Sequence, residues 1–259
     1  MAERDFFPPS FIGRVITFTQ PDSQWKLTQK LREKNCQLTH DDTLTWPDAT
    51  GEVYGTFLCT NCEDESQKAV MRVIMQLPFA GSEFAGPQDR ARQAVSTPPE
   101  DVKDMLDAHI LLNRRNSKTG PRLLSFTYPT QLDTDFVPGG FFLCLLLEKL
   151  PGRQLGPWFW DLDRPKRDEI RECLKRSWIE CLSITRYNPT AALTKMFWDD
   201  STHRLSFYDF WTGGKLNPDE EMPWSEYVWF CWELVKKPRG SRLPRDDTEG
   251  HTIMKSWEW

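Results

Sequence analysis

The sequence predicts an α+β protein in two lobes, and the order of its apolar segments supports this prediction. Short segments rich in β-branched and aromatic residues alternate with turn residues between positions 43 and 147, which is typical of strands. One stretch with helical periodicity, near residues 97–112, interrupts them after the third strand. A break at residues 150–152 precedes a second helical stretch at 163–185. We therefore expect a strand-rich lobe, a linker and a mainly helical lobe.

The first lobe is expected to contain five strands and one helix. Two alternating segments joined by a Pro- and Gly-containing turn at residues 47–51 indicate a hairpin. Pro98 or Pro99 suits the first turn of the helix, where the backbone N–H has no intrahelical partner. The strands are expected at residues 43–46, 52–58, 69–77, 123–128 and 141–147.

The second lobe is expected to begin with a long helix. Asp163 can cap it, and apolar positions from Ile170 to Thr185 recur at helical spacing. A loop at 187–195, a short hairpin at 196–211 and a further helix near 224–235 are expected to follow. The chain is thus divided into an N-terminal extension (1–30), an N-lobe (31–149), a C-lobe (150–235) and a polar C-terminal tail (236–259).

Composition narrows the functional classes. The chain has 259 residues, a net charge of −5, 39% hydrophobic and 27% charged residues, as in an ordinary globular protein. No basic face for nucleic acid is indicated. No apolar run approaches the roughly 18 residues that a membrane span needs, and the first residues lack a secretory signal. We expect a cytoplasmic protein that binds neither nucleic acid nor membrane; a homo-oligomer stays open.

The seven cysteines do not indicate a metal site. Cys59 and Cys62 form a lone Cys-x-x-Cys pair, and no second pair or His pair follows at the spacing of a zinc site. In a reducing compartment the cysteines are expected to be small buried residues. We therefore expect no metal and no cofactor.

A catalytic segment is suggested by residues 187–211. In kinase-like phosphotransferases this segment contains His-x-Asp, an Asn five residues after the Asp, and then a strand ending in Asp-Phe-Gly or Asp-x-Glu. Here Asn188 stands in place of the His, Thr190 in place of the catalytic Asp and Lys195 in place of the metal-binding Asn, whereas Asp209 is kept. The segment resembles that of the protein-kinase and aminoglycoside-phosphotransferase superfamily, with a degenerate catalytic loop.

The residues around the linker strengthen this resemblance. Glu148-Lys149-Leu150-Pro151-Gly152, then Phe159 to Asp163 and Arg167 to Arg171, are similar to a group of small fungal kinase-like proteins. The resemblance extends from about Val53 to Asp209. It implies a two-lobed protein-kinase-like fold with a five-stranded antiparallel N-lobe, one inserted helix and a mainly helical C-lobe.

The resemblance also assigns roles in the first lobe. Arg72 takes the place of the strand-three Lys that binds phosphates, and Asp107 the place of the helix carboxylate that orients this cation. The alternative, which the residue types favour over a catalytic role, is a structural ion pair between Arg72 and Asp107. The glycines of the expected hairpin, Gly51 and Gly55, are weak evidence for a phosphate-binding loop.

Efficient phosphoryl transfer is not expected from this set of residues. Thr190 cannot accept a proton at neutral pH, and Lys195 would repel a metal ion. Loss of one acid–base group alone costs about 10²–10⁴ in rate. The expected catalytic residues are Asp209, Lys195, Asp107 and His109, and the expected ligand-binding residues are Arg72, Glu148, Asn188, Thr190, Trp211 and Trp158.

Three functions follow from these residues. The first is a repurposed enzyme of fungal-type secondary metabolism that binds a small, partly apolar organic molecule in the cleft between the lobes and catalyses a cyclisation, dehydration or isomerisation. Such a reaction needs positioning and a few hydrogen bonds more than a metal. The second is a non-catalytic pseudokinase that binds a nucleotide or a protein. The third is a weak small-molecule phosphotransferase that uses Asp209.

Overall fold

The chain forms two compact units in the computed structural model, which describes residues 5–46, 49–210, 215–217, 219, 222–240 and 253–259. The first unit comprises Met1–Lys103 and Leu123–Lys149, and the second comprises Asp104–Arg122 and Leu150–Trp259. A large antiparallel sheet organises the first unit, and one long helix with a small sheet organises the second. The expected α+β class is confirmed.

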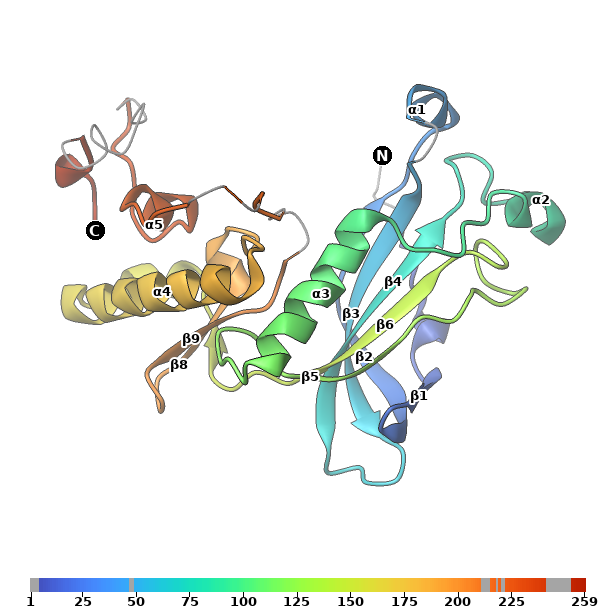
Figure 1. Ribbon diagram of the computed structural model, residues 1–259, viewed down its shortest axis with the longest axis horizontal. Helices are drawn as coiled ribbons and strands as arrows, with labels where there is room; N and C mark the ends of the chain where they lie inside the picture. Colours follow the sequence, from blue (N-terminus) through green and yellow to red (C-terminus); the bar gives the residue numbers. More distant parts are fainter. Residues whose placement is uncertain (1–4, 47–48, 211–214, 218, 220–221, 241–252) are drawn as a thin grey trace. The chain divides into compact units, whose positions relative to one another are not determined.

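The sheet of the first unit has six strands, one more than expected, in the order β1-β2-β3-β4-β6-β5 (Figure 1). All neighbouring strands are antiparallel. The strands are β1 (Val15–Thr19), β2 (Asp22–Cys36), β3 (Gly51–Asn61), β4 (Lys68–Leu77), β5 (Leu123–Thr127) and β6 (Phe142–Glu148).

The additional strands come from residues that were expected to form an N-terminal extension. In β1, Ile16 and Phe18 are buried and alternate with exposed neighbours, and Trp25 and Leu27 of β2 are buried in the same way. Ile16 faces Trp25 in the register of the two strands. This period of two places one side of each strand in the core and the other in solvent. Residues 15–19 and 22–30 of the expected extension therefore belong to the sheet itself.

The prediction of a hairpin with its turn at residues 47–51 is wrong. Helix α1 (His40–Thr45) occupies the segment that was expected to be its first strand. Thr39 caps this helix: its Oγ1 accepts from the Asp42 backbone N at 3.2 Å, and the Asp42 carboxylate accepts from the Thr39 backbone N at 2.8 Å. This reciprocal capping box outweighs the strand propensity of Thr and Trp. The partner of β3 is instead β2.

The sheet of the first unit curls until its two outer strands, β1 and β5, lie side by side. The Ser125 Oγ in β5 donates to the Gln20 backbone O at 2.8 Å, just beyond β1. The interior is filled by apolar side chains, including two from the N-terminal segment, Phe6 and Phe7, which are both 1% exposed. The N-terminal segment therefore forms part of the core.

A glycine makes room for this segment. A Cβ on Gly55 would lie 2.6 Å from the Phe7 ring and 2.5 Å from the Phe57 ring. The Phe7 ring packs edge-on against Phe57, with centroids 5.2 Å apart. Gly55 therefore serves a close packing contact within β3, as glycine often does in strands, and not a phosphate-binding turn.

Two helices lie between β4 and β5: α2 (Pro87–Ala91) and α3 (Glu100–Arg114). The helix that was expected near residues 97–112 is α3, and it begins directly after Pro98 and Pro99. Most of α3, from Asp104 onwards, belongs to the second unit.

The second unit is built around α4 (Arg164–Thr185). The Asp163 Oδ1 accepts from the Lys166 backbone N at 2.9 Å, so the expected cap is confirmed. A hairpin runs beside α4, where the Ser177 Oγ donates to the Leu205 backbone O at 2.9 Å (Figure 1). The remaining elements are β7 (Arg153–Gln154), η2 (Pro157–Asp161), η3 (Leu193–Lys195), β8 (Met196–Asp199), β9 (Arg204–Phe207), α5 (Tyr227–Cys231) and η4 (Met254–Ser256).

The second unit is less helical than expected over its described residues. The helix predicted near 224–235 is reduced to the five residues of α5. The end of the chain packs within the same unit, because Lys236 and Glu258 exchange backbone hydrogen bonds at 2.9 and 3.0 Å and Trp257 is buried. No helix in the described part of the chain combines the length and apolarity that crossing a membrane requires.

Candidate functional site

The loop expected to be catalytic follows α4 and is fixed by the end of that helix. Arg186 adopts a left-handed conformation, with φ of 60°, and ends the helix. The Thr185 Oγ1 accepts from the Tyr187 backbone N at 3.0 Å and donates to the Cys181 backbone O at 2.8 Å. The Asn188 Oδ1 accepts from the buried Trp178 indole at 3.3 Å. The first half of the loop is therefore held by side chains of α4 and of its last turn.

The central feature of the site is an ion pair between Lys195 and Asp209. The Lys195 Nζ donates to the Asp209 Oδ2. The two side chains are 12% and 9% exposed. Lys195 is the last residue before β8, and Asp209 follows β9 by two positions. The β8–β9 hairpin thus brings together two residues that are fourteen positions apart in the sequence.

Backbone and ring contacts hold the two residues of this pair in place. The Thr190 backbone N donates to the Asp209 backbone O at 3.0 Å, and the Tyr208 backbone N donates to the Lys195 backbone O at 3.3 Å. The Lys195 Nζ also lies 5.5 Å from the centre of the Tyr208 ring, within the range of a cation–π contact. Asp209, Lys195 and Thr190, which were expected to belong to one site, therefore lie together.

A second group of predicted and unpredicted residues lies around α3 and the end of the hairpin. His109 is completely buried, and its ring packs edge-on against Phe210 with centroids 5.2 Å apart. The Tyr187 hydroxyl donates to the Asp104 Oδ1 at 2.9 Å. The sequence analysis did not identify Asp104, although it lies about one helical turn before Asp107. Asp107 itself is exposed.

The remaining predicted residues are distributed over both units. Trp158 is half-buried, donates its indole N–H to the Gln154 backbone O at 2.9 Å, and stacks under the Arg153 guanidinium at 4.4 Å. In the first unit, Arg72 is buried in β4 and Glu148 ends β6. Trp211 lies outside the described residues.

The pair does not fit the magnesium ion that the superfamily resemblance implies. In that arrangement the Asp after the hairpin binds the metal, but here the Asp209 carboxylate already accepts from an ammonium group. A cation at this distance repels a divalent ion. Elsewhere too, no three His, Cys, Asp or Glu side chains among the described residues gather closely enough to hold a metal ion.

Glu52 in β3 is a titratable group that the sequence analysis did not single out. Burial and the nearby Asp101 raise the pKa of its carboxyl, a hydrogen bond from the Tyr54 hydroxyl lowers it, and the net result is a pKa of about 7. The donor–acceptor distance of that bond is 3.3 Å. A carboxyl with a pKa near 7 exchanges its proton readily at neutral pH, which is a frequent property of functional groups. The sequence feature that could have pointed to Glu52 is the position of a glutamate at the start of an apolar strand.

One solved structure similar to this chain is the Cydia pomonella granulovirus kinase PK-1, at 12% sequence identity and a TM-score of 0.42. The similarity covers 74% of this chain and 53% of the viral kinase, so it spans about half the length of that protein. No known protein family and no curated protein matches the sequence. A likeness of this strength assigns neither an activity nor an active residue to the chain.

Proposed function

We propose that this chain is a protein-kinase-like protein that has lost phosphoryl transfer and binds a small, partly apolar organic molecule beside the Lys195–Asp209 pair. The order of elements supports the kinase-like part of the proposal. Strands β2, β3 and β4 precede α3, β5 and β6 follow it, and α4, a loop and the β8–β9 hairpin come next. This is the order that the resemblance implies, with β1 as an addition.

The Lys195–Asp209 ion pair is the observation on which the loss of phosphoryl transfer rests. Both side chains are largely buried, so their mutual attraction is weakly screened by solvent. To bind a metal, Asp209 would have to give up this partner and accept a second cation beside it. The ammonium group therefore neutralises the carboxylate in the place where a phosphotransferase uses a metal ion.

Two further features of the chain support the same proposal. Gly55 is covered by the Phe7 ring within the first unit and cannot form a phosphate-binding turn. Thr190 occupies the position of the catalytic Asp in the resemblance, and a hydroxyl is no base at neutral pH. Phosphoryl transfer depends on positioning of the phosphates and of the acceptor hydroxyl, and these two changes remove the groups that would provide it.

The chemistry left to the chain is proton transfer. In the second unit Lys195 is a cation held near the half-buried Tyr208 ring. In the first unit, and as a separate group, Glu52 is a carboxyl with a pKa of about 7. Groups of this kind serve cyclisation, dehydration or isomerisation, in which a general acid or base contributes about 10²–10⁴ in rate. We place the protein, on its resemblance to fungal kinase-like proteins, in secondary metabolism.

The first test compares thermal unfolding of the purified chain with and without excess Mg-ATP. A ligand at 100 times its Kd adds about 2.7 kcal/mol to stability. We expect no magnesium-dependent shift. A shift that requires magnesium would overturn the proposal and support a weak phosphotransferase. A shift with ATP alone would support the alternative, a non-catalytic nucleotide-binding module.

The second test is the Lys195→Asn substitution, which removes the cation and restores the residue type of a metal-binding catalytic loop. Breaking a buried ion pair costs roughly 3–5 kcal/mol, so we expect a lower unfolding temperature that millimolar Mg²⁺ partly restores. The matched control is Lys195→Asn with Asp209→Asn, in which the carboxylate of the pair is also removed, so Mg²⁺ should have no effect. If Mg²⁺ stabilises the wild-type chain as much as the single variant, Lys195 does not exclude the metal.

A further inference from the structure

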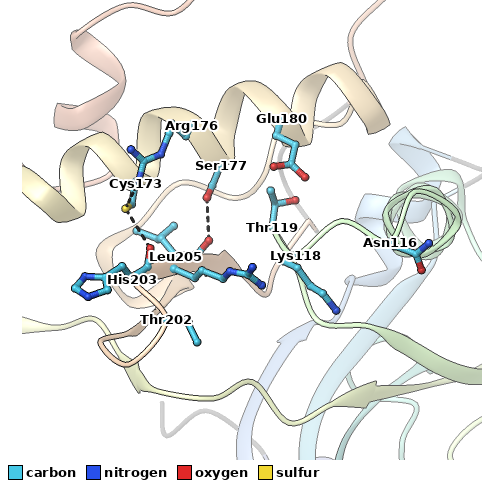
Figure 2. A pocket seen from close by; sticks show the side chains of 11 residues that line it. Asn116, Lys118, Thr119, Cys173, Arg176, Ser177, Glu180, Thr202, His203 and Leu205 are labelled. Carbon is cyan, nitrogen blue, oxygen red and sulfur yellow. Dashed lines mark hydrogen bonds between the residues drawn. The ribbon is translucent and has the colours of Figure 1, made fainter.

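A pocket separate from the Lys195–Asp209 pair lies within the second unit (Figure 2). It has a volume of about 410 Å³. Three parts of the chain line it: the segment after α3, one face of α4, and the turn between β8 and β9 with the start of β9.

Hydrogen bonds fix these three parts to one another. The Ser177 Oγ on α4 donates to the Leu205 backbone O at 2.9 Å. The Ser206 Oγ donates to the Lys118 backbone O at 2.9 Å, and the Phe207 backbone N donates to the Thr119 backbone O at 2.7 Å. The walls of the pocket are therefore connected by bonds that do not depend on a ligand.

The pocket concentrates positive charge in a chain whose net charge is −5. Lys118, Arg176 and Arg204 line it, against one carboxylate, Glu180. None of the three cations forms an ion pair with a carboxylate among the described residues. The Arg176 Nη2 donates to the Cys173 Sγ at 2.9 Å, whereas Glu180 accepts from the Ser117 hydroxyl at 2.7 Å. An anion bound in the pocket would be attracted by all three cations.

The shape of the pocket favours an extended anion over a single phosphate. Figure 2 shows Arg176 and Lys118 on different sides of the pocket, with their charged groups pointing in different directions. No Phe, Tyr or Trp side chain lines the pocket, so it lacks the large rings on which the bases of single-stranded nucleic acid stack. The one ring in the lining, His203, already pairs with the Glu169 carboxylate. A peptide with several carboxylates matches separated cations, and its backbone N–H groups can donate to Glu180.

We infer that this pocket binds an acidic segment of a partner protein, through Lys118, Arg176 and Arg204. This interaction is independent of the function proposed for the Lys195–Asp209 pair. Its strength is electrostatic and therefore falls as salt concentration rises.

The experiment measures fluorescence anisotropy of a labelled hexaglutamate peptide with the full chain at low and physiological salt. The test variant combines Lys118→Ala, Arg176→Ala and Arg204→Ala, and the matched control combines Lys26→Ala, Lys34→Ala and Arg92→Ala, which remove the same charge from exposed positions of the first unit. A single exposed ion pair contributes little to binding, so the variant removes all three cations together. We expect the test variant to weaken binding roughly tenfold and the control to change it less than twofold.

Three outcomes would overturn the inference. One is an equal loss of affinity in both triple variants, which would mean that only net charge matters. The second is no measurable binding of hexaglutamate by the wild-type chain at low salt. The third is tighter binding of labelled oligothymidine than of hexaglutamate with the same dependence on the three cations, which would assign the pocket to nucleic acid. Far-ultraviolet circular dichroism of each variant checks that it is folded.

Discussion

At the scale of single residues, the Glu52 carboxyl makes stability depend on pH near neutrality. Its pKa in the folded chain is about 7, against an ordinary value of 4.5, because it is buried and lies near Asp101. The folded state therefore holds this proton more tightly than the unfolded state does. The stabilising effect is complete below pH 4.5 and is lost as pH rises through 7.

Glu52→Gln is expected to remove this dependence. The variant should match the wild-type chain near pH 4.5 and exceed it at pH 8 by up to roughly 3 kcal/mol, because a pKa shift of one unit corresponds to 1.36 kcal/mol. Urea unfolding at pH 4.5, 6 and 8 measures the difference. A stability gain that is the same at all three pH values would show that the ionisation of Glu52 is not its source.

The backbone at Gly152, in the second unit, adopts a conformation that favours glycine and lies very close to the backbone of β8. Its φ is +81°, and a Cβ there would lie 2.2 Å from the Trp198 backbone O. Gly152→Ala is therefore expected to cost more than about 3 kcal/mol, since the left-handed conformation alone costs roughly 1–2 kcal/mol and the backbone of β8 must also move.

Gly81→Ala is the matched control for that variant. Gly81 has a similar φ of +91°, but a Cβ there would meet nothing within 4 Å. We expect a cost of roughly 1–2 kcal/mol. Thermal unfolding of both variants separates conformational strain from steric overlap, and equal midpoints would contradict the assignment of a clash at Gly152.

Sequence reasoning at the residue scale identified part of the candidate site. Asn188, Thr190, Lys195 and Asp209 could be selected by spacing, and the loop and hairpin bring the last three together. The direct ion pair could not be read from spacing, because it depends on the path of β8 and β9. The raised pKa of Glu52 depends on burial and on Asp101, which is distant in sequence.

At the scale of elements, α4 organises the second unit and carries a testable cap. Asp163→Ala removes the acceptor for the Lys166 backbone N, and loss of such a cap costs about 0.5–2 kcal/mol. The control is Asp161→Ala, an exposed residue of η2 that precedes the helix. Denaturant midpoints should fall for Asp163→Ala and stay nearly constant for Asp161→Ala. Equal midpoints would mean that the cap contributes nothing.

Elements with strong local signals were predicted well, and those decided by distant partners were not. The apolar runs of β4 and β6 and the periodicity of α4 identified these elements. The segment before residue 47 was misassigned because the capping box of Thr39 and Asp42 was overlooked beside a pattern that also suits a strand. β2 was missed because many charged residues interrupt its alternation, and β1 because it has only five residues, which were assigned to an N-terminal extension.

At the scale of the whole molecule, the N-terminal segment is part of the fold of the first unit. Phe7 is 1% exposed and packs against Phe11 and Phe57, with ring centroids 4.9 and 5.2 Å away. Phe7→Ala is expected to destabilise the chain by about 3–5 kcal/mol through the cavity that it leaves. Phe84→Ala, at a side chain 85% exposed, should change stability by less than about 0.5 kcal/mol. Similar losses in the two variants, measured by urea unfolding, would contradict the core role of Phe7.

The contact between Gln20 and Ser125 also determines when the first unit can be completed during protein synthesis. The two residues are 105 positions apart, which a ribosome covers in roughly 5–20 s. Throughout that interval β1 has no β5 beside it, whereas Phe7 can pack on Phe57 as soon as β3 has been made. A nascent chain stalled before residue 123 would therefore expose the unpaired edge of β1. Unpaired strand edges favour aggregation, so we expect ribosome-associated chaperones to bind such a chain.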